Sequence, residues 1–219
     1  MRVDELKWDE RGLVTVVVQD ELTGEIRMLA HANQEAVEST LETGEAHFFS
    51  RSRGAQWKKG ETSGNVIRVH GVYADCDDDA LIYLGRAEGP SCHTGADTCF
   101  FTRLVADGEG EPASARPTLL ALEHELVARR DSTEAKSYTK HLLSAGAPKI
   151  GEKLREEADE LARAVDAESE ARVASEMADL LYHAMVGLLF RGVGLADVME
   201  VLRARFGRSG HDEKASRGS

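Results

Sequence analysis

The stretch Asp107-Gly-Glu-Gly-Glu-Pro-Ala-Ser-Ala-Arg-Pro117 divides the sequence into two parts of different character. Glycine, proline and acidic residues without an apolar period are typical of a linker between domains. Residues 1–106 contain eight of the twelve aromatic residues and all three cysteines, whereas residues 118–219 contain long runs rich in alanine, leucine, glutamate and arginine. We therefore predict two domains, 1–106 and 118–219, joined by a linker over 107–117.

The composition is typical of a soluble, acidic protein. Asp and Glu number 39 against 27 Lys and Arg, a net charge of −12, which disfavours binding of nucleic acid through bulk charge. The longest apolar stretch, 184–190, is far too short to span a membrane, and the N-terminus lacks the apolar core of a signal peptide. Three cysteines are too few for a disulfide framework. We expect a cytoplasmic protein that binds neither nucleic acid nor membranes.

The first domain has the sequence pattern of an α+β fold with mostly antiparallel strands and a helix. Asn33 is a suitable N-cap for a helix over 34–42, and Gly44 is suited to end it. Short β-branched or aromatic runs between turn residues predict the strands. These runs lie at 13–18, 26–30, 46–50, 66–74, 81–84 and 99–104.

The second domain has the pattern of an all-α helical bundle. Apolar residues at helical spacing predict helices over 119–130, 134–145, 149–166, 170–190 and 195–206. Gly146-Ala147-Pro148 separates the second from the third, because proline is tolerated only in the first turn of a helix.

An acidic run, Asp75-Cys-Asp-Asp-Asp79, follows one of the predicted strands. In an extended chain the alternate residues Asp75, Asp77 and Asp79 point to one side, where their repulsion would be relieved by a hard cation such as magnesium or calcium. A solvated acidic turn would have the same sequence, so the run alone leaves both interpretations open.

The three cysteines, Cys76, Cys92 and Cys99, lack the close C-x-x-C spacing of a structural zinc site. Three thiolates would leave one coordination position open, which is what a catalytic zinc ion needs in order to bind water. The alternative is three separate buried thiols, since free cysteine is often buried. His93 is a candidate base or ligand, although a lone histidine is more often neither.

Two polar stretches between the strands suggest anion binding in this acidic domain. Ser50-Arg-Ser-Arg53 offers two guanidinium groups, Arg51 and Arg53, that suit a phosphate. Trp57-Lys-Lys-Gly-Glu-Thr-Ser-Gly-Asn65 adds Lys59, Glu61 and Ser63 beside glycine-rich backbone. Loops with solvated charges are the alternative for either stretch alone.

Taken together with Gly89-Pro-Ser-Cys-His-Thr-Gly95 and Cys99-Phe-Phe101, these motifs resemble phosphoribosyl-AMP cyclohydrolase of histidine biosynthesis over nearly all of residues 10–104. The resemblance implies magnesium at Asp75, Asp77 and Asp79, and zinc at Cys76, Cys92 and Cys99. It also implies a homodimer, because the zinc ligands of that family come from two subunits. One departure is His31-Ala32, where the family usually has Tyr-Met; that position is not a metal ligand.

The second domain carries carboxylates at helical spacing. Glu157 and Glu160 are three residues apart, as are Glu176 and Asp179, so each pair lies on one helix face. Two antiparallel helices would bring these faces together as a cluster that needs magnesium, such as the magnesium of a nucleotide polyphosphate. Glu156 lies on the same stripe, and Lys149 and Lys153 are placed to bind phosphate oxygens.

A solvated helix with Glu/Lys ion pairs is the alternative for residues 152–160. Glu176 and Asp179 disfavour it for their own helix, because residues 174–189 are apolar on most faces and should be buried. Carboxylates on such a helix need partners or a metal. The excess of apolar surface also predicts a subunit interface.

The spacing Glu157-x-x-Glu160 and Glu176-x-x-Asp179 resembles the all-α nucleoside triphosphate pyrophosphohydrolases. Further motifs resemble phosphoribosyl-ATP pyrophosphohydrolase over about 119–217: Ser137-Tyr-Thr139, Pro148-Lys-Ile-Gly-Glu-Lys153, Asp179-Leu-Leu-Tyr-His183 and Ser209-Gly-His-Asp-Glu-Lys-Ala-Ser-Arg217. That enzyme catalyses the step before the cyclohydrolase, and the two are known fused in this order.

The two resemblances together imply a bifunctional hydrolase that converts phosphoribosyl-ATP to phosphoribosyl-AMP and then opens the adenine ring. The expected catalytic residues are His93 as a proton shuttle in the first domain and Glu157 and Glu160 in the second. The rival interpretations are a house-cleaning pyrophosphohydrolase of other nucleotides and a non-enzymatic protein with structural zinc and a helical dimerisation module.

Overall fold

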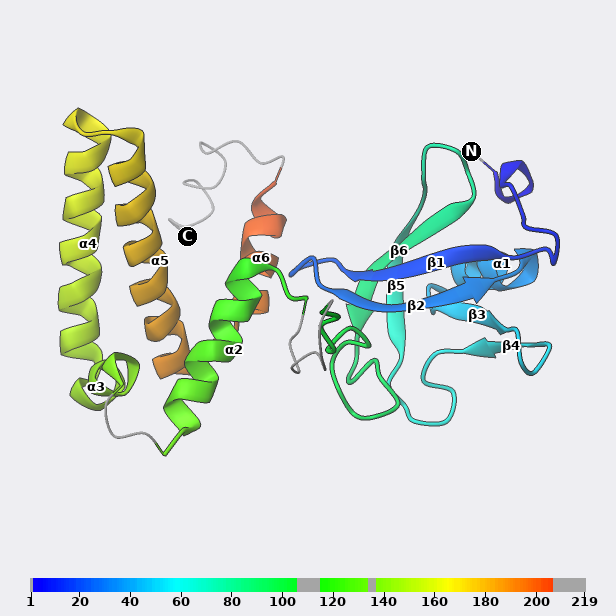
Figure 1. Cartoon of the computed structure of the whole chain (residues 1–219), viewed down its shortest axis with the longest axis horizontal. Coiled ribbons are helices and arrows are strands. Elements are labelled where there is room, and N and C mark those ends of the chain that lie inside the picture. The colour runs from blue at the N-terminus through cyan, green and yellow to red at the C-terminus, as the bar shows by residue number, and fades with distance from the viewer. Residues whose placement is uncertain (1, 106–114, 134–136, 207–219) are drawn as a thin grey trace, which may run out of the picture. The chain divides into compact units, whose positions relative to one another are not determined.

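The computed structural model describes residues 2–105, 115–133 and 137–206 (Figure 1). The chain separates into two compact units, Met1–Pro117 and Thr118–Ser219, and each is described by itself. The boundary lies at the end of the glycine- and proline-rich stretch, where few residues favour a regular structure.

The first unit is built on a four-stranded sheet of β1 (Val14–Asp20), β2 (Ile26–Ala32), β5 (Ile67–Ala74) and β6 (Ala80–Ala87), in the order β2-β1-β6-β5. Pairs β1/β2 and β5/β6 are antiparallel, and the central pair β1/β6 is parallel. The mostly antiparallel α+β pattern is thus confirmed. A two-stranded sheet of β3 (His47–Ser50) and β4 (Ala55–Lys58) and a short 3-10 turn, η1 (Val3–Glu5), complete the unit.

Local signals define the helix of this unit, α1 (Gln34–Thr43). The Asn33 side chain accepts a hydrogen bond from the Ala36 backbone N–H, and Gly44 ends the helix in the left-handed conformation, as expected from the sequence. The core lies between this helix and one face of the sheet. Alternate residues of β1 are buried there with the stacked rings of Phe48 and Tyr83.

Two strand predictions need correction. Strand β4 was not predicted, because its residues Ala55–Lys58 form only a short mixed run whose pairing with β3 depends on the turn before it. No described strand includes 99–104: the Cys99 N–H donates to the Arg27 carbonyl on the edge of β2, but Phe100 and Phe101 then remain exposed. A β-propensity signal alone does not make a run pair along a neighbouring edge over several residues.

The second unit is a helical bundle, as predicted, of α2 (Thr118–Asp131), α3 (Tyr138–Ala145), α4 (Ala147–Ala167), α5 (Glu170–Arg191) and α6 (Leu195–Arg205). Part of the predicted helix over 134–145 falls on residues 134–136, which lie outside the described residues; Ser137 caps α3. Pro148 lies in the first turn of α4, where it costs no helical hydrogen bond. Figure 1 shows α4 and α5 side by side, joined by a short turn.

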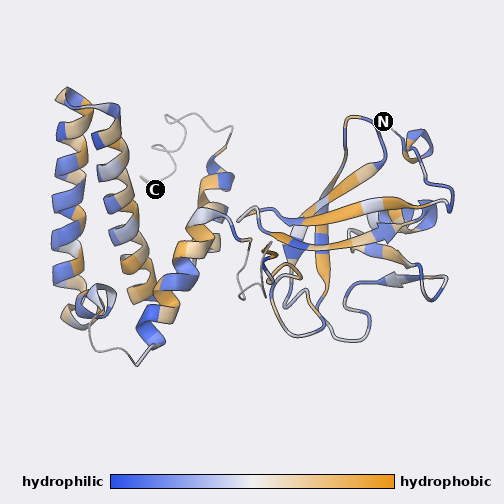
Figure 2. Ribbon diagram, in the orientation of Figure 1, coloured by the Kyte–Doolittle hydropathy of each residue, from blue (hydrophilic) through white to orange (hydrophobic). Residues whose placement is uncertain are grey.

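Hydropathy differs between the two long helices of the bundle. Figure 2 shows α4 as mainly hydrophilic, whereas α5 has more hydrophobic positions, especially toward its C-terminal end. By length and composition α5 is the one helix of the described residues that could cross a membrane. It packs on α4 and α2 and carries the buried polar residues Glu176 and His183, but only 22% of its most apolar stretch is buried, so the burial predicted for this helix is partial.

Candidate functional site

A hollow of about 520 Å³ opens on the first unit and gathers most of the polar residues singled out from the sequence. Its walls come from the turn after β4 and from the loop that carries two of the cysteines. The predicted site residues that line it are Arg53, Lys59, Glu61, Ser63, Cys92, His93 and Cys99. Arg51 does not line this hollow, although Arg53 does.

The turn after β4 places its functional groups through a tight backbone. Gly60 has a φ of +83°, and a Cβ there would lie 2.6 Å from the Asn65 backbone, so only glycine fits. Lys59 is buried, and its Nζ donates to the Asn65 carbonyl at 3.3 Å. Burial lowers the pKa of Lys59. The hollow therefore contains a largely desolvated cation, which suits an anionic ligand.

Cys92 and Cys99 are adjacent thiols at the ends of one loop. Thr94 Oγ1 donates to Cys92 Sγ at 3.1 Å, and this hydrogen bond lowers the pKa of Cys92. Burial raises the pKa of Cys99. His93 Nδ1 lies 3.9 Å from Cys92 Sγ. Two neighbouring thiols, of which Cys92 has a lowered pKa, beside a histidine are a donor set that fits zinc.

Cys76 does not join this pair within one chain. It is exposed in the turn between β5 and β6, and among the described residues no metal-ligand group contains it together with Cys92 and Cys99. A single chain therefore offers two of the three predicted zinc ligands at one place.

The three aspartates beside Cys76 do come together. Oxygen atoms of Asp75, Asp77 and Asp79 all lie within 4.8 Å of one another. The expected extended conformation is wrong, however, because the segment is a turn with Asp78 at a φ of +68°. The Asp75 carboxylate closes this turn by accepting the backbone N–H groups of Asp79 and Ala80.

The electrostatics of the turn fit a cation. The hydrogen bond from the Ala80 N–H lowers the pKa of Asp75, whereas hydrogen bonding with Asp75 raises the pKa of Asp77. The pKa values of Asp75 and Asp77 thus shift in opposite directions because the two carboxyl groups share one small volume. Asp77 and Asp79 also line a second hollow, of about 390 Å³, together with Trp8 and His31.

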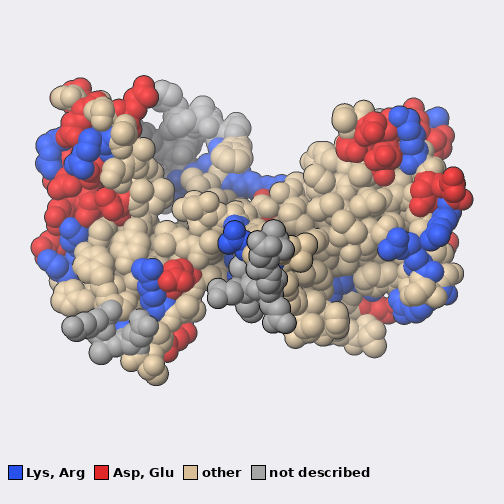
Figure 3. All heavy atoms as spheres, viewed as in Figure 1, with Lys and Arg blue, Asp and Glu red and all other residues tan. Residues whose placement is uncertain are grey.

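In the second unit, α4 and α5 bring together Glu157, Glu176 and Asp179, whose carboxylate oxygens lie within 4.8 Å of one another. Glu157 and Glu176 are buried, and Glu160 interacts with Glu176 on the same face. This is the arrangement expected from the two i, i+3 pairs. Figure 3 shows acidic side chains interspersed with basic ones on this unit.

Two cationic side chains pair with the carboxylates of the cluster. Lys153 Nζ lies 2.9 Å from carboxylates of both Glu156 and Glu157, and these bonds raise the pKa of Lys153. Arg172 lies 2.5 Å from Glu176. Burial nevertheless raises the pKa of Glu176, so its ionised form is incompletely compensated. The cluster fits magnesium, which would replace part of this pairing.

The remaining predicted residues of this unit lie farther from the three carboxylates. Glu156 pairs with Lys153 and is half-exposed, and Lys149 pairs with Glu152 at 2.8 Å on the surface. The Ser209–Arg217 motif lies outside the described residues.

Sequence reasoning assigned no role to a buried histidine beside the cluster. His183 Nδ1 lies 2.9 Å from the Asp179 carbonyl and 3.6 Å from Glu157, and the Tyr138 hydroxyl contacts its Nε2 at 3.2 Å. Arg172 was missed as well. His183 lies four residues after Asp179 and Arg172 four residues before Glu176, and this i, i+4 spacing was a signal that each shares a helix face with its carboxylate.

The regions of the two sites match known families. The model of phosphoribosyl-AMP cyclohydrolase matches residues 28–101, and that of phosphoribosyl-ATP pyrophosphohydrolase matches residues 119–206. The histidine biosynthesis bifunctional protein hisIE, chloroplastic, of Arabidopsis thaliana is 46% identical, over 98% of this chain and 80% of its own length. The HisIE protein of Wolinella succinogenes is 42% identical, over 98% and 97%.

The chain belongs to the bifunctional HisIE family. A further HisIE relative, from Bacillus subtilis, is 41% identical over 93% of this chain and 96% of its own length. The HisIE match assigns the first unit to the cyclohydrolase and the second to the pyrophosphohydrolase, as the motifs implied. The aspartate turn and the three cysteines lie in the first matched region, and the three clustered carboxylates lie in the second.

Proposed function

We propose that the helical unit releases pyrophosphate from phosphoribosyl-ATP at the cluster of Glu157, Glu176 and Asp179. The observation that supports this is the burial of Glu157 and Glu176 on α4 and α5, opposite each other and paired with Lys153 and Arg172. Magnesium bound there would neutralise polyphosphate charge and lower the pKa of water. Glu160, on the same face, would take the proton, and Lys153 and Lys149 would bind phosphate oxygens.

The first unit would then open the adenine ring of phosphoribosyl-AMP in its 520 Å³ hollow. Zinc held by the cysteines would supply an activated water. His93, beside Cys92, is placed to carry the proton, and the desolvated cation Lys59 together with Arg53 is placed to bind the substrate phosphate. Magnesium at Asp75, Asp77 and Asp79, with Arg51, would assist phosphate binding. Both reactions would take place in the cytoplasm.

A homodimer would complete the zinc site, with Cys76 of one copy joining Cys92 and Cys99 of the other. The support is the exposure of Cys76 on a turn that does not meet the other two cysteines in one chain. Asp77, the neighbour of Cys76, lines one hollow of the chain, and Cys92 and Cys99 line the other.

Mixing two inactive variants tests the shared site. In Cys76→Ala and Cys92→Ser, separately, ring opening should be lost. After subunit exchange, half of the dimers would be mixed, each with one intact site of two, so activity should recover to about a quarter of wild type. Exchange without recovery would contradict ligands shared across a dimer.

The sequential assay tests the function as a whole. Purified protein is incubated with phosphoribosyl-ATP, magnesium and zinc, and the products are followed over time. Pyrophosphate and phosphoribosyl-AMP should form first, followed by the ring-opened product. A panel of other nucleoside triphosphates is the control for the house-cleaning alternative: faster turnover of any of them would contradict the proposed substrate.

A further inference from the structure

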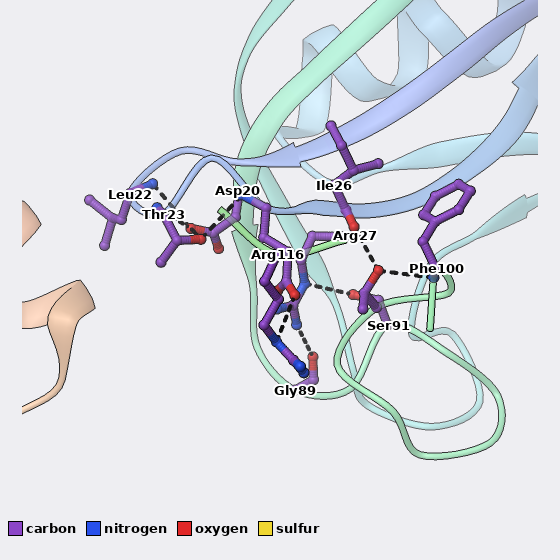
Figure 4. Close-up of polar contacts among 11 residues, drawn as sticks. Asp20, Leu22, Thr23, Ile26, Arg27, Gly89, Ser91, Phe100 and Arg116 are labelled. Carbon is purple, nitrogen blue, oxygen red and sulfur yellow. Dashed lines mark hydrogen bonds and ion pairs between the residues drawn. The ribbon is translucent and has the colours of Figure 1, made fainter. Parts of the chain in front are cut away.

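The loop with Cys92 and Cys99 lies against the free edge of β2, and one residue of that strand binds both of its ends. The Cys99 N–H donates to the Arg27 carbonyl at 2.9 Å. The Arg27 guanidinium donates to the Gly89 carbonyl and to Ser91 Oγ, both at 3.2 Å, immediately before Cys92 (Figure 4). The backbone of Arg27 therefore binds Cys99, and its side chain binds the residues that immediately precede Cys92.

Further bonds make the loop a closed unit on this edge. Thr98, which is buried, donates its hydroxyl to the Ile26 carbonyl at 2.7 Å. Within the loop, the Cys92 N–H donates to the Ala96 carbonyl at 3.0 Å. The loop is thus attached to β2 on both sides, and the two hydrogen bonds of the Arg27 guanidinium are its attachment on the Cys92 side.

The Arg27 side chain is itself held by a buried carboxylate. Glu25 is 3% exposed, and its carboxylate lies 2.9 Å from Arg27 Nη1 and 3.2 Å from Arg116 Nε. Arg116 belongs to the stretch that links the two domains in the sequence, and Figure 4 shows it beside Arg27. The Arg27 Nη1–Glu25 contact is a charge-assisted hydrogen bond, which orients the Arg27 guanidinium, whereas Arg116 Nε and Glu25 Oε1 form an ion pair without a hydrogen bond.

These three residues lie just outside the ranges matched by the two domain models. The cyclohydrolase match begins at residue 28, and Arg116 lies between the two matched regions. The matched region contains the thiols but not the groups that orient their loop in this chain.

We propose that Arg27 is a positioning residue that keeps Cys92 and Cys99 at the separation zinc requires, with Glu25 and Arg116 keeping its guanidinium in place. The inference rests on the proposed zinc site. Groups that orient metal ligands without touching the metal typically change affinity or activity about 10- to 100-fold when they are removed. The end of the linker is thereby part of the support of the cyclohydrolase site.

The test measures metal binding in the full-length protein. Arg27→Met keeps a long side chain and the backbone carbonyl but removes the guanidinium group that binds Gly89 and Ser91. Zinc affinity, from competition with a chromogenic chelator, should fall about 10-fold or more, and the thiolate-to-cobalt absorption band of the cobalt-loaded protein should shift. Arg27→Lys, which retains the charge but not the guanidinium group, should restore thermal stability without restoring zinc affinity. Arg116→Gln should lower the affinity in the same direction by a smaller factor.

Two further variants separate the possible failures. Glu25→Gln combined with Arg27→Met removes the Arg27 guanidinium without leaving the Glu25 carboxylate buried and charged, although Arg116 loses its ion pair, and it should still bind zinc weakly. Arg68→Met, an exposed arginine of β5 that pairs with Glu45 and Glu88, is the matched control and should bind zinc normally.

Wild-type affinity and an unshifted cobalt band in Arg27→Met and in the double variant would overturn the role of Arg27, provided that Cys92→Ser loses zinc. Wild-type zinc binding by Cys92→Ser would instead overturn the zinc site itself. Unchanged affinity in Arg116→Gln would remove the linker from the proposal.

Discussion

Leu142→Ala should destabilise the helical unit and leave the cyclohydrolase unit intact. Leu142 is 0% exposed in α3 and belongs to a cluster with Leu120, Ile150, Val186 and Leu195, which come from four other helices. Because several helices border Leu142, the cavity left by the substitution can close only partly. The free energy of unfolding should therefore fall by about 3 kcal/mol, within the usual range of about 2–5 kcal/mol. For a unit of this size that corresponds to a fall in melting temperature of about 12–24 °C.

The assay follows both activities and the helical signal in the full-length protein, at one fixed protein concentration. After brief heating at increasing temperatures, pyrophosphate release from phosphoribosyl-ATP should be lost early, together with part of the far-ultraviolet circular dichroism. Ring opening of added phosphoribosyl-AMP should persist to the wild-type temperature. Val165→Ala, a substitution at a residue that is 67% exposed on α4, is the control and should change neither activity.

Two outcomes would refute this reasoning. If both activities were lost at the same lowered temperature, the two units would unfold as one cooperative structure. If Leu142→Ala lowered the melting temperature no more than Val165→Ala, the site would repack fully and the burial of Leu142 would not contribute as assumed.

Three further predictions concern the sites. Cys92→Ser should lose about one zinc per chain by metal analysis. In the wild type, zinc affinity should fall as the pH drops, first as the pH passes below the raised pKa of Cys99 and then as it passes below the lowered pKa of Cys92. An affinity that does not change with pH would contradict thiolate ligation. Glu176→Gln should lose pyrophosphate release yet be more stable than wild type in chelator at neutral pH. Because the pKa of Glu176 is raised in the folded chain, its ionised form is destabilising, so the gain in stability should vanish as the pH falls below the pKa of a glutamate in the unfolded chain. Equal stability of the two proteins at neutral pH would count against a self-repelling cluster. Cys76→Ala should accumulate phosphoribosyl-AMP from phosphoribosyl-ATP, while Glu157→Gln should be inert toward phosphoribosyl-ATP and still open added phosphoribosyl-AMP; loss of both reactions in a folded Cys76→Ala protein would indicate one composite site.

The helix predictions succeeded where the signals were local. The Asn33 cap and the left-handed Gly44 limit α1 through hydrogen bonds within a few residues, and Pro148 begins α4 because it needs no N–H donor there. The i, i+3 pairs of α4 and α5 likewise follow from helix geometry once the two helices pack side by side.

The strand predictions failed where pairing was non-local. A run such as 99–104 becomes a strand only if it pairs along an edge over several residues, whereas its Cys99 N–H contacts the edge of β2 and Phe100 and Phe101 turn out to be exposed; β4 forms because it pairs with β3. The aspartates illustrate a third case. Their clustering was predicted, but it results from a turn closed by Asp75 instead of from an extended chain.

By itself the sequence determined the two-domain organisation, the class of each domain, the family motifs and the candidate metal ligands, because these depend on residue type and short spacing. Only the tertiary structure decided which of those residues meet. It separates Cys76 from Cys92 and Cys99, brings Glu157 to Glu176, and places Arg27 between Glu25 and the cysteine loop. The physical reason is that such contacts join residues far apart in the chain, whose approach depends on the packing of the whole unit.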